Sequence, residues 1–144
     1  MKGSFVTDTA TMCVFDIASL KHRLEDDVDW WSIPNAELEE VNRGNVAFLN
    51  LGTDGKYSFT FVTKLHCPQV EINLRAPSGR IFLGAAEEVT ADGFEPEAIC
   101  GGIFLDVQPG EYRLCVSRNS TEISLSLHLT DSWKSNEFGS LIRI

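Results

Sequence analysis

The sequence predicts a mainly β fold, an antiparallel two-sheet sandwich with one short helical excursion. The first observation is alternation, since Val70, Ile72 and Leu74 are separated by polar residues and therefore share one face of a strand. The second is the presence of about eight or nine such runs, joined by short turns, a pattern typical of sandwiches. The third is that helical periodicity is scarce. A jelly-roll barrel fits the same pattern and stays open as an alternative.

The expected strands follow one another along the whole chain. They cover residues 11–17, 45–51, 57–62, 70–75, 80–83, 103–107, 112–116, 123–129 and 140–144. The segment Gly52-Thr53-Asp54-Gly55 predicts a hairpin between the second and third strands, because Gly and Asp tolerate the positive φ of tight turns. Pro77-Ser78-Gly79 and Pro109-Gly110 indicate two further turns between strands.

One helix is expected over residues 36–41, with Asn35 as its cap and Gly44 just past its end. Residues 19–24 predict a further helical turn. No repeat, low-complexity tract or linker divides residues 1–144, so we expect a single domain. A chain of 144 residues buries enough surface to fold without a disulfide or a metal.

Composition excludes several classes of partner. The chain has 12 Lys and Arg against 21 Asp and Glu, a formal net charge of −9. Nucleic acid and anionic membranes are therefore not expected as partners, because both repel an acidic surface. No apolar stretch approaches the roughly 18 residues of a membrane span. The N-terminal residues contain no apolar signal core, so a cytoplasmic location is expected.

Soft metal ligands and catalytic motifs are sparse. The cysteines are expected to be buried free thiols in a reducing compartment, and they are Cys13, Cys67, Cys100 and Cys115. Among the histidines (His22, His66 and His128), only His66 lies beside a cysteine, so no zinc site and no cofactor is expected. Nucleophile elbows, phosphate-binding loops and H-E-x-x-H are absent, which predicts no catalytic residues.

Acidic residues are concentrated in two segments. Residues 25–40 contain seven acids and no Lys or Arg, and residues 87–111 contain seven more, again without a basic residue. Complementary charge raises the rate of association, so these segments predict a basic protein partner. The alternative is that the acids only keep loops solvated. A cation-chelating loop over residues 87–97 is a weaker alternative.

The first acidic segment also contains two adjacent tryptophans. Their side chains point to opposite sides of an extended backbone, so both are hard to bury in one core, and Trp is enriched at binding hot spots. We therefore expect a partner-binding patch, and its residues are Asp26, Asp27, Asp29, Trp30, Trp31, Glu37, Glu39 and Glu40. In the alternative, one ring covers the core and the other packs on the helix. Trp133 is expected at the edge of the core.

Four features of the chain together point to a class of protein. They are its size, its acidity, its lack of catalytic motifs and the strand Pro109-Gly110-Glu111-Tyr112-Arg113-Leu114-Cys115-Val116. In these features the chain resembles bacterial immunity proteins, which neutralise toxins delivered between competing cells. The resemblance implies a non-catalytic inhibitor that covers the basic active-site surface of a toxin acting in the cytoplasm.

Three other functions remain open on the sequence. A small-ligand- or carbohydrate-binding sandwich would use Trp30 and Trp31 as a stacking platform. A metal-dependent enzyme on a β scaffold would use His66 or His128. A self-associating subunit would pair through unprotected sheet edges.

Overall fold

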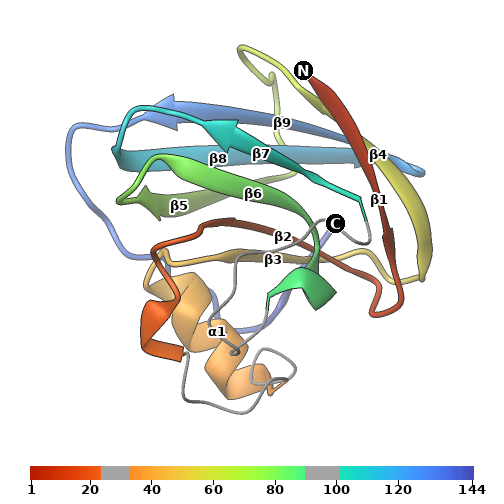
Figure 1. Cartoon of the computed structure of the whole chain (residues 1–144), viewed down its shortest axis with the longest axis horizontal. Coiled ribbons are helices and arrows are strands. Elements are labelled where there is room, and N and C mark those ends of the chain that lie inside the picture. Colours follow the sequence, from red (N-terminus) through yellow and green to blue (C-terminus); the bar gives the residue numbers. More distant parts are fainter. Residues whose placement is uncertain (24–32, 90–100) are drawn as a thin grey trace.

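The computed structural model describes residues 1–23, 33–89 and 101–144, and its strands form two five-stranded sheets (Figure 1). Sheet A has the order β1 (Lys2–Thr7), β4 (Gly55–Phe61), β9 (Glu122–Leu129), β8 (Gly110–Asn119) and β5 (Val70–Ala76). Sheet B has the order β10 (Ile142–Arg143), β3 (Ala47–Asn50), β2 (Thr11–Asp16), β6 (Arg80–Ala85) and β7 (Ile103–Asp106). The prediction of two β-sheets with a short helix is confirmed.

The core lies between the inner faces of the two sheets. Alternation in β5 points Ile72, Leu74 and Ala76 inward, and all three are fully buried. Aromatic rings fill the centre of the core, with Phe5 stacked on Tyr57 at 5.7 Å between ring centroids. The strand β1 was not predicted, because Gly3 interrupts its apolar alternation, yet Phe5 in its middle is buried.

The strand pairings differ from a purely antiparallel sandwich. Among the described residues, β4 pairs with β9 and β3 with β10 in parallel, while the other named pairings are antiparallel. The predicted hairpin over residues 52–55 is wrong, because β3 lies in sheet B and β4 lies in sheet A. The turns after β5 and β7 likewise carry the chain between sheets. By contrast, the tight turn between β8 and β9 joins two neighbouring antiparallel strands of sheet A.

Side-chain hydrogen bonds hold the crossings between sheets. The hydroxyl of Tyr57 donates to the carbonyl of Thr53 at 2.7 Å, and Tyr112 donates in the same way to Gln108 at 2.5 Å. Each tyrosine therefore fastens the turn that precedes its own strand, as in the tyrosine corner of other sandwiches. Burial raises the pKa of Tyr112 above its ordinary value.

A buried carboxylate holds the β5–β6 crossing. Asp16 at the end of β2 is fully buried, and it accepts hydrogen bonds from the backbone N–H groups of Ala18, Ser78 and Gly79 and from the Ser78 hydroxyl, at 2.7–2.9 Å. Gly79 has φ of +80°, and a Cβ there would lie 2.2 Å from the Val107 carbonyl, so only glycine fits. We call residues 16–18, 77–79 and 107–110 the crossover corner.

The helix α1 (Pro34–Asn42) begins two residues earlier than predicted and ends one residue later. Ile33 is its N-cap and Pro34 occupies the first helical turn, so Asn35 lies inside the helix and is not its cap. Gly44 lies just past the end with φ of +76°, as predicted, and the ring of Trp133 packs directly on it. Residues 21–23 form the short 3-10 helix η1, and residues 86–88 form a second one, η3.

The segment after β9 returns to α1 along the edge of sheet A. The side-chain amide of Asn136 donates to the carbonyls of Val41 and Asn73 at 2.8 Å, and its oxygen accepts from the Asn73 N–H at 2.8 Å. Because β5 is an edge strand, this one side chain satisfies backbone groups that the sheet leaves unpaired. Asn42 fastens the same segment through the backbone of Phe138.

Candidate partner-binding surface

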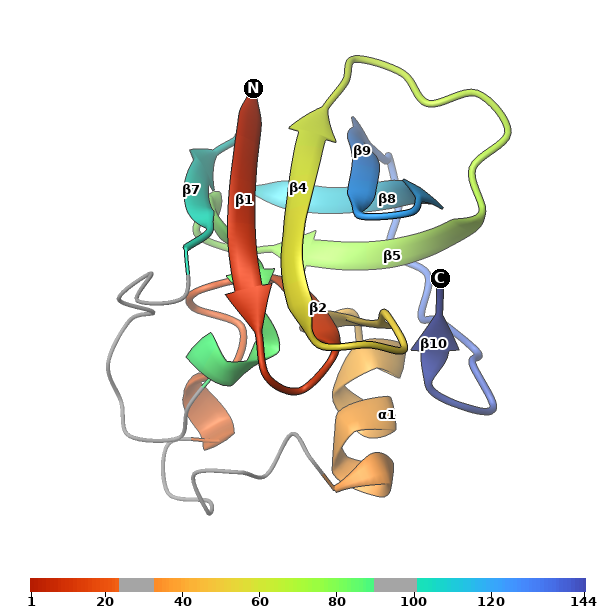
Figure 2. The same cartoon turned by 90° about the vertical axis from the view of Figure 1, so that its right-hand side faces the viewer.

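The helical elements gather at one end of the sandwich, away from the β8–β9 hairpin (Figures 1 and 2). The elements η1 and α1 flank residues 24–32, and η3 precedes residues 90–100. By sequence, these two stretches contain seven acids and no basic residue, so they carry most of the net charge of −9. Five predicted patch residues lie outside the described residues: Asp26, Asp27, Asp29, Trp30 and Trp31.

Glu40 was expected in the surface patch but lies in the interior. Its side chain is fully buried, with one oxygen 2.7 Å from His22 Nε2 and the other accepting from Asn45 Nδ2 at 2.8 Å. A buried carboxylate is stable only with such partners. Glu40 therefore joins η1 to α1 across the ends of residues 24–32, and its carboxylate is not available at the surface.

Glu37 is half-buried in the first turn of α1. Desolvation raises the pKa of its carboxyl from 4.5 to about 7, because burial disfavours the charged form. The group is consequently poised between its neutral and charged forms near neutral pH. A cation brought against it would favour the charged form.

Glu39 and Ile33 are exposed on the same helix. The Glu39 carboxylate lies 2.7 Å from the Arg43 guanidinium, one turn further along, and both side chains are about half exposed. Ile33 is 52% exposed at the helix N-terminus. Of the three α1 glutamates expected in the patch, Glu39 is thus exposed, Glu37 is partly exposed, and Glu40 is buried.

The cysteines and histidines do not converge on a metal site. Within residues 1–23, 33–89 and 101–144, no group of three or more His, Cys, Asp or Glu side chains has the geometry to hold a metal ion. Cys13 and Cys115 are buried free thiols, as expected, whereas Cys67 is exposed; Cys100 lies outside the described residues. Burial raises the pKa of the Cys13 thiol well above its ordinary value, and the negative charges of Glu87 and Glu88 raise it further. A thiol with a raised pKa is a poor nucleophile.

A serine and a histidine meet on β9, a pairing that no sequence motif predicted. Ser126 Oγ lies 3.0 Å from His128 Nε2, as alternate residues of one strand face the same side. The pairing resembles part of a nucleophile–base arrangement, but Ser126 is fully buried and thus closed to a substrate.

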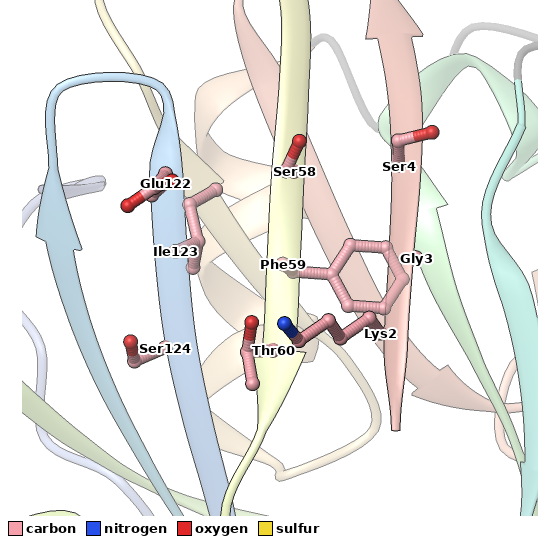
Figure 3. Close-up of a pocket in the computed structure, with 9 residues that line it drawn as sticks. All are labelled: Lys2, Gly3, Ser4, Ser58, Phe59, Thr60, Glu122, Ile123 and Ser124. Atoms are coloured by element: carbon pink, nitrogen blue, oxygen red, sulfur yellow. The ribbon is translucent and has the colours of Figure 1, made fainter.

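An open groove of about 540 Å³ lies over β1, β4 and β9 (Figure 3). Its polar side chains come from adjacent strands in register, and they are Lys2, Ser4, Ser58, Thr60, Glu122 and Ser124. The charges of Lys2 and Glu122 oppose each other, and no lining side chain is a buried polar group without a partner. The groove therefore indicates no particular ligand.

Among the described residues, no helix has both the length and the apolar character needed to cross a membrane. The whole chain, residues 1–144, matches the model of a family described as a family of unknown function, DUF6386. None of the curated proteins compared matches the sequence.

Two solved structures are similar to this one. A protein described as "Crocagin biosynthetic gene J" has a TM-score of 0.56 and 12% identity, over 90% of this chain and 97% of that chain. ComJ from Bacillus subtilis, described as an inhibitor of the DNA degrading activity of NucA, has a TM-score of 0.52 and 12% identity, over 88% of this chain and 93% of its own. At this identity the similarity shows a shared fold.

Proposed function

The chain belongs to the DUF6386 family of unknown function, and we propose that it is a non-catalytic inhibitor that binds a basic protein partner. The proposed binding surface is the acidic end of the sandwich, with Asp26, Asp27, Asp29, Trp30, Trp31, Glu37 and Glu39. Glu40 is left out because it is buried.

The observation that carries the proposal is the distribution of charge. Two stretches next to η1, α1 and η3 contain seven acids without a basic residue, whereas the rest of the chain is nearly neutral. Such a field attracts a basic surface and accelerates encounter, an effect that weakens as salt rises.

The fold of ComJ supports the choice of partner class. ComJ is described as the inhibitor of a DNA-degrading enzyme, and an enzyme that binds DNA presents cations to the phosphates. An acidic inhibitor meets those cations in place of the nucleic acid. We propose a cytoplasm-acting toxin of this electrostatic type as the partner, which gives the chain the role of an immunity protein.

In the proposed complex the acids and the tryptophans act differently. Asp27 and Asp29 steer the encounter and therefore affect the association rate. Trp30 and Trp31 anchor the centre of the interface, so their loss acts on dissociation. The two sheets hold the surface in place, and the Glu40–His22 contact joins the helical elements on either side of residues 24–32.

The first experiment is to identify and then inhibit the partner. The tagged chain is used to capture proteins from its own cells at low salt, the captured proteins are released at high salt, and the main basic one is purified. We expect the chain to inhibit the activity of that protein at a stoichiometry of one to one. Capture without inhibition would contradict the proposal.

Charge-reversed variants then test the surface. D27K/D29K should slow association by about tenfold or more at low salt. The matched control E122K/D131K changes the net charge equally, but its residues are exposed on the β8–β9 hairpin side and in the segment that follows β9. Trp31→Ala should instead speed dissociation and cost about 2 kcal/mol of binding free energy. Equal slowing by both double variants would show a general charge effect and refute the patch.

A further inference from the structure

A second hollow, of about 530 Å³, lies where the crossover corner meets the residues after α1. Its volume is within the ordinary range for small-molecule sites. The lining residues come from four separate segments, and they are Ser19, Asn45, Arg75, Pro77, Pro109, Gly110 and Glu111. None of them belongs to the proposed inhibitory surface.

Ser19 provides the first evidence that this hollow is a site. The residue is 9% exposed, and its hydroxyl is the buried side-chain polar atom that lacks a hydrogen-bond partner among the described residues. An unsatisfied buried hydroxyl costs free energy, so native proteins rarely keep one without a use. A ligand in the hollow would supply the missing partner.

Arg75 provides the second piece of evidence that this hollow is a site. Its guanidinium carbon lies 4.0 Å from the centre of the Trp133 ring, which holds the planar group in one orientation. Trp133 is itself fixed by its contact with Gly44, whose carbonyl accepts from the Arg75 N–H at 2.7 Å. Arg75 is exposed, and among the described residues its guanidinium donates no hydrogen bond to protein, so the stacked group offers its N–H donors to a ligand in the hollow.

Glu111 completes the charge pattern. It is the register partner of Arg75 across β5 and β8, yet the two side chains form no ion pair in the part of the chain described. Asn45 adds an amide whose nitrogen already donates to Glu40. The hollow therefore combines one cation, one anion and one orphan hydroxyl between two prolines.

This combination discriminates by charge. A simple anion that met Arg75 would be repelled by Glu111 and by the net charge of the chain, and a simple cation would be repelled by Arg75. A molecule with both charges a few atoms apart satisfies both groups. We propose that this hollow binds a small zwitterion of the free amino acid class, with its carboxylate on Arg75 and Ser19 and its ammonium on Glu111.

The test uses the full chain, with L-leucine as the probe because the two prolines offer an apolar wall. Two relatives, N-acetyl-L-leucine and L-leucinamide, each lack one of the two charges. Binding is followed by NMR shifts of the Trp133 indole and the Ser19 amide during titration. L-leucine should bind at least about tenfold more tightly than either relative, since each loses a charge-assisted hydrogen bond.

Variants locate the site. Arg75→Gln, Glu111→Gln and Ser19→Ala should each weaken binding of L-leucine, and Ser19→Ala should leave the melting temperature equal or higher because it removes an orphan hydroxyl. The matched control is Arg113→Gln, an exposed arginine on β8 outside the hollow. No shifts at millimolar L-leucine, equal binding of all three probes, or an equal effect of Arg113→Gln would overturn the proposal. Inhibition of a protein partner is measured separately, so either proposal can fail alone.

Discussion

The crossover corner and the helix α1 both hold carboxylates, but they use them in different ways. At the corner Asp16 is fully buried and accepts four hydrogen bonds from the backbone and a hydroxyl. Along α1, Glu40 is buried, Glu37 is half-buried and Glu39 is exposed beside Arg43. A carboxylate stabilises the fold where it is buried among hydrogen-bond donors, as Asp16 and Glu40 are, whereas the exposed Glu39 stays at the surface.

Asp16→Ala should give the largest effect, because it leaves the N–H groups of Ala18, Ser78 and Gly79 without their acceptor. We expect a loss of about 3 kcal/mol in the free energy of unfolding, measured by urea denaturation. Asp16→Asn keeps the shape but turns a donor toward those N–H groups, so it should lose about half as much. A loss below about 1 kcal/mol for Asp16→Ala would show that the corner does not depend on this carboxylate.

Two neighbouring glutamates of α1 sharpen the comparison within one helix. Glu40→Ala should lose about 2 kcal/mol, because it leaves Asn45 and His22 without their shared acceptor. Glu39→Ala should lose less than about 0.5 kcal/mol, as is usual for an exposed pair one turn apart. Thermal unfolding of both variants at one pH measures the difference, and equal losses would contradict the assignment of Glu40 to the interior.

Removing the charge of Glu37 should stabilise the folded protein. Its folded pKa is about 7 and its ordinary value is 4.5, so the folded state binds more protons between these values and stability falls as pH rises through them. Glu37→Gln should therefore raise the free energy of unfolding at pH 7.5 by about 1 kcal/mol, discounted for partial exposure. At pH 4 the variant and the original chain should agree. A benefit that is the same at both pH values would show that desolvation of the charge is not its cause.

A modest effect is expected at the tyrosine corners. Tyr112→Phe and Tyr57→Phe each remove one hydroxyl-to-carbonyl hydrogen bond, for a loss of about 1 kcal/mol or less. Because the folded pKa of Tyr112 is raised, the unfolded chain loses its proton first, and stability should fall as pH rises through about 10. Tyr112→Phe should lack that part of the fall. If denaturation curves of this variant show an unchanged loss at alkaline pH, another group causes it.

Alternation revealed most strands, because burial of one face imposes a period of two on the sequence. It missed β1, where Gly3 and Ser4 weaken the pattern around Phe5. It also paired strands wrongly across Gly52–Gly55, since the same turn residues serve hairpins and crossings between sheets. The features that distinguish them, Tyr57, Tyr112 and Asp16, act through hydrogen bonds that spacing does not reveal.

The candidate surface could be predicted only in part. The charge of residues 25–40 is visible in the sequence, but whether a glutamate points inward depends on partners such as His22 and Asn45, which lie on other elements. Ser19 gave no signal, because a serine becomes an orphan donor only when the surrounding fold buries it.

Asn136 has a consequence for how copies of this protein meet. At the centre of β5 its amide already occupies the hydrogen-bonding positions of Asn73 that an incoming strand would use. A strand of a second molecule therefore cannot pair with the centre of β5 to extend sheet A along this edge. The same amide also bonds to Val41 at the end of α1, so this barrier to aggregation lasts as long as the segment after β9 stays on the helix.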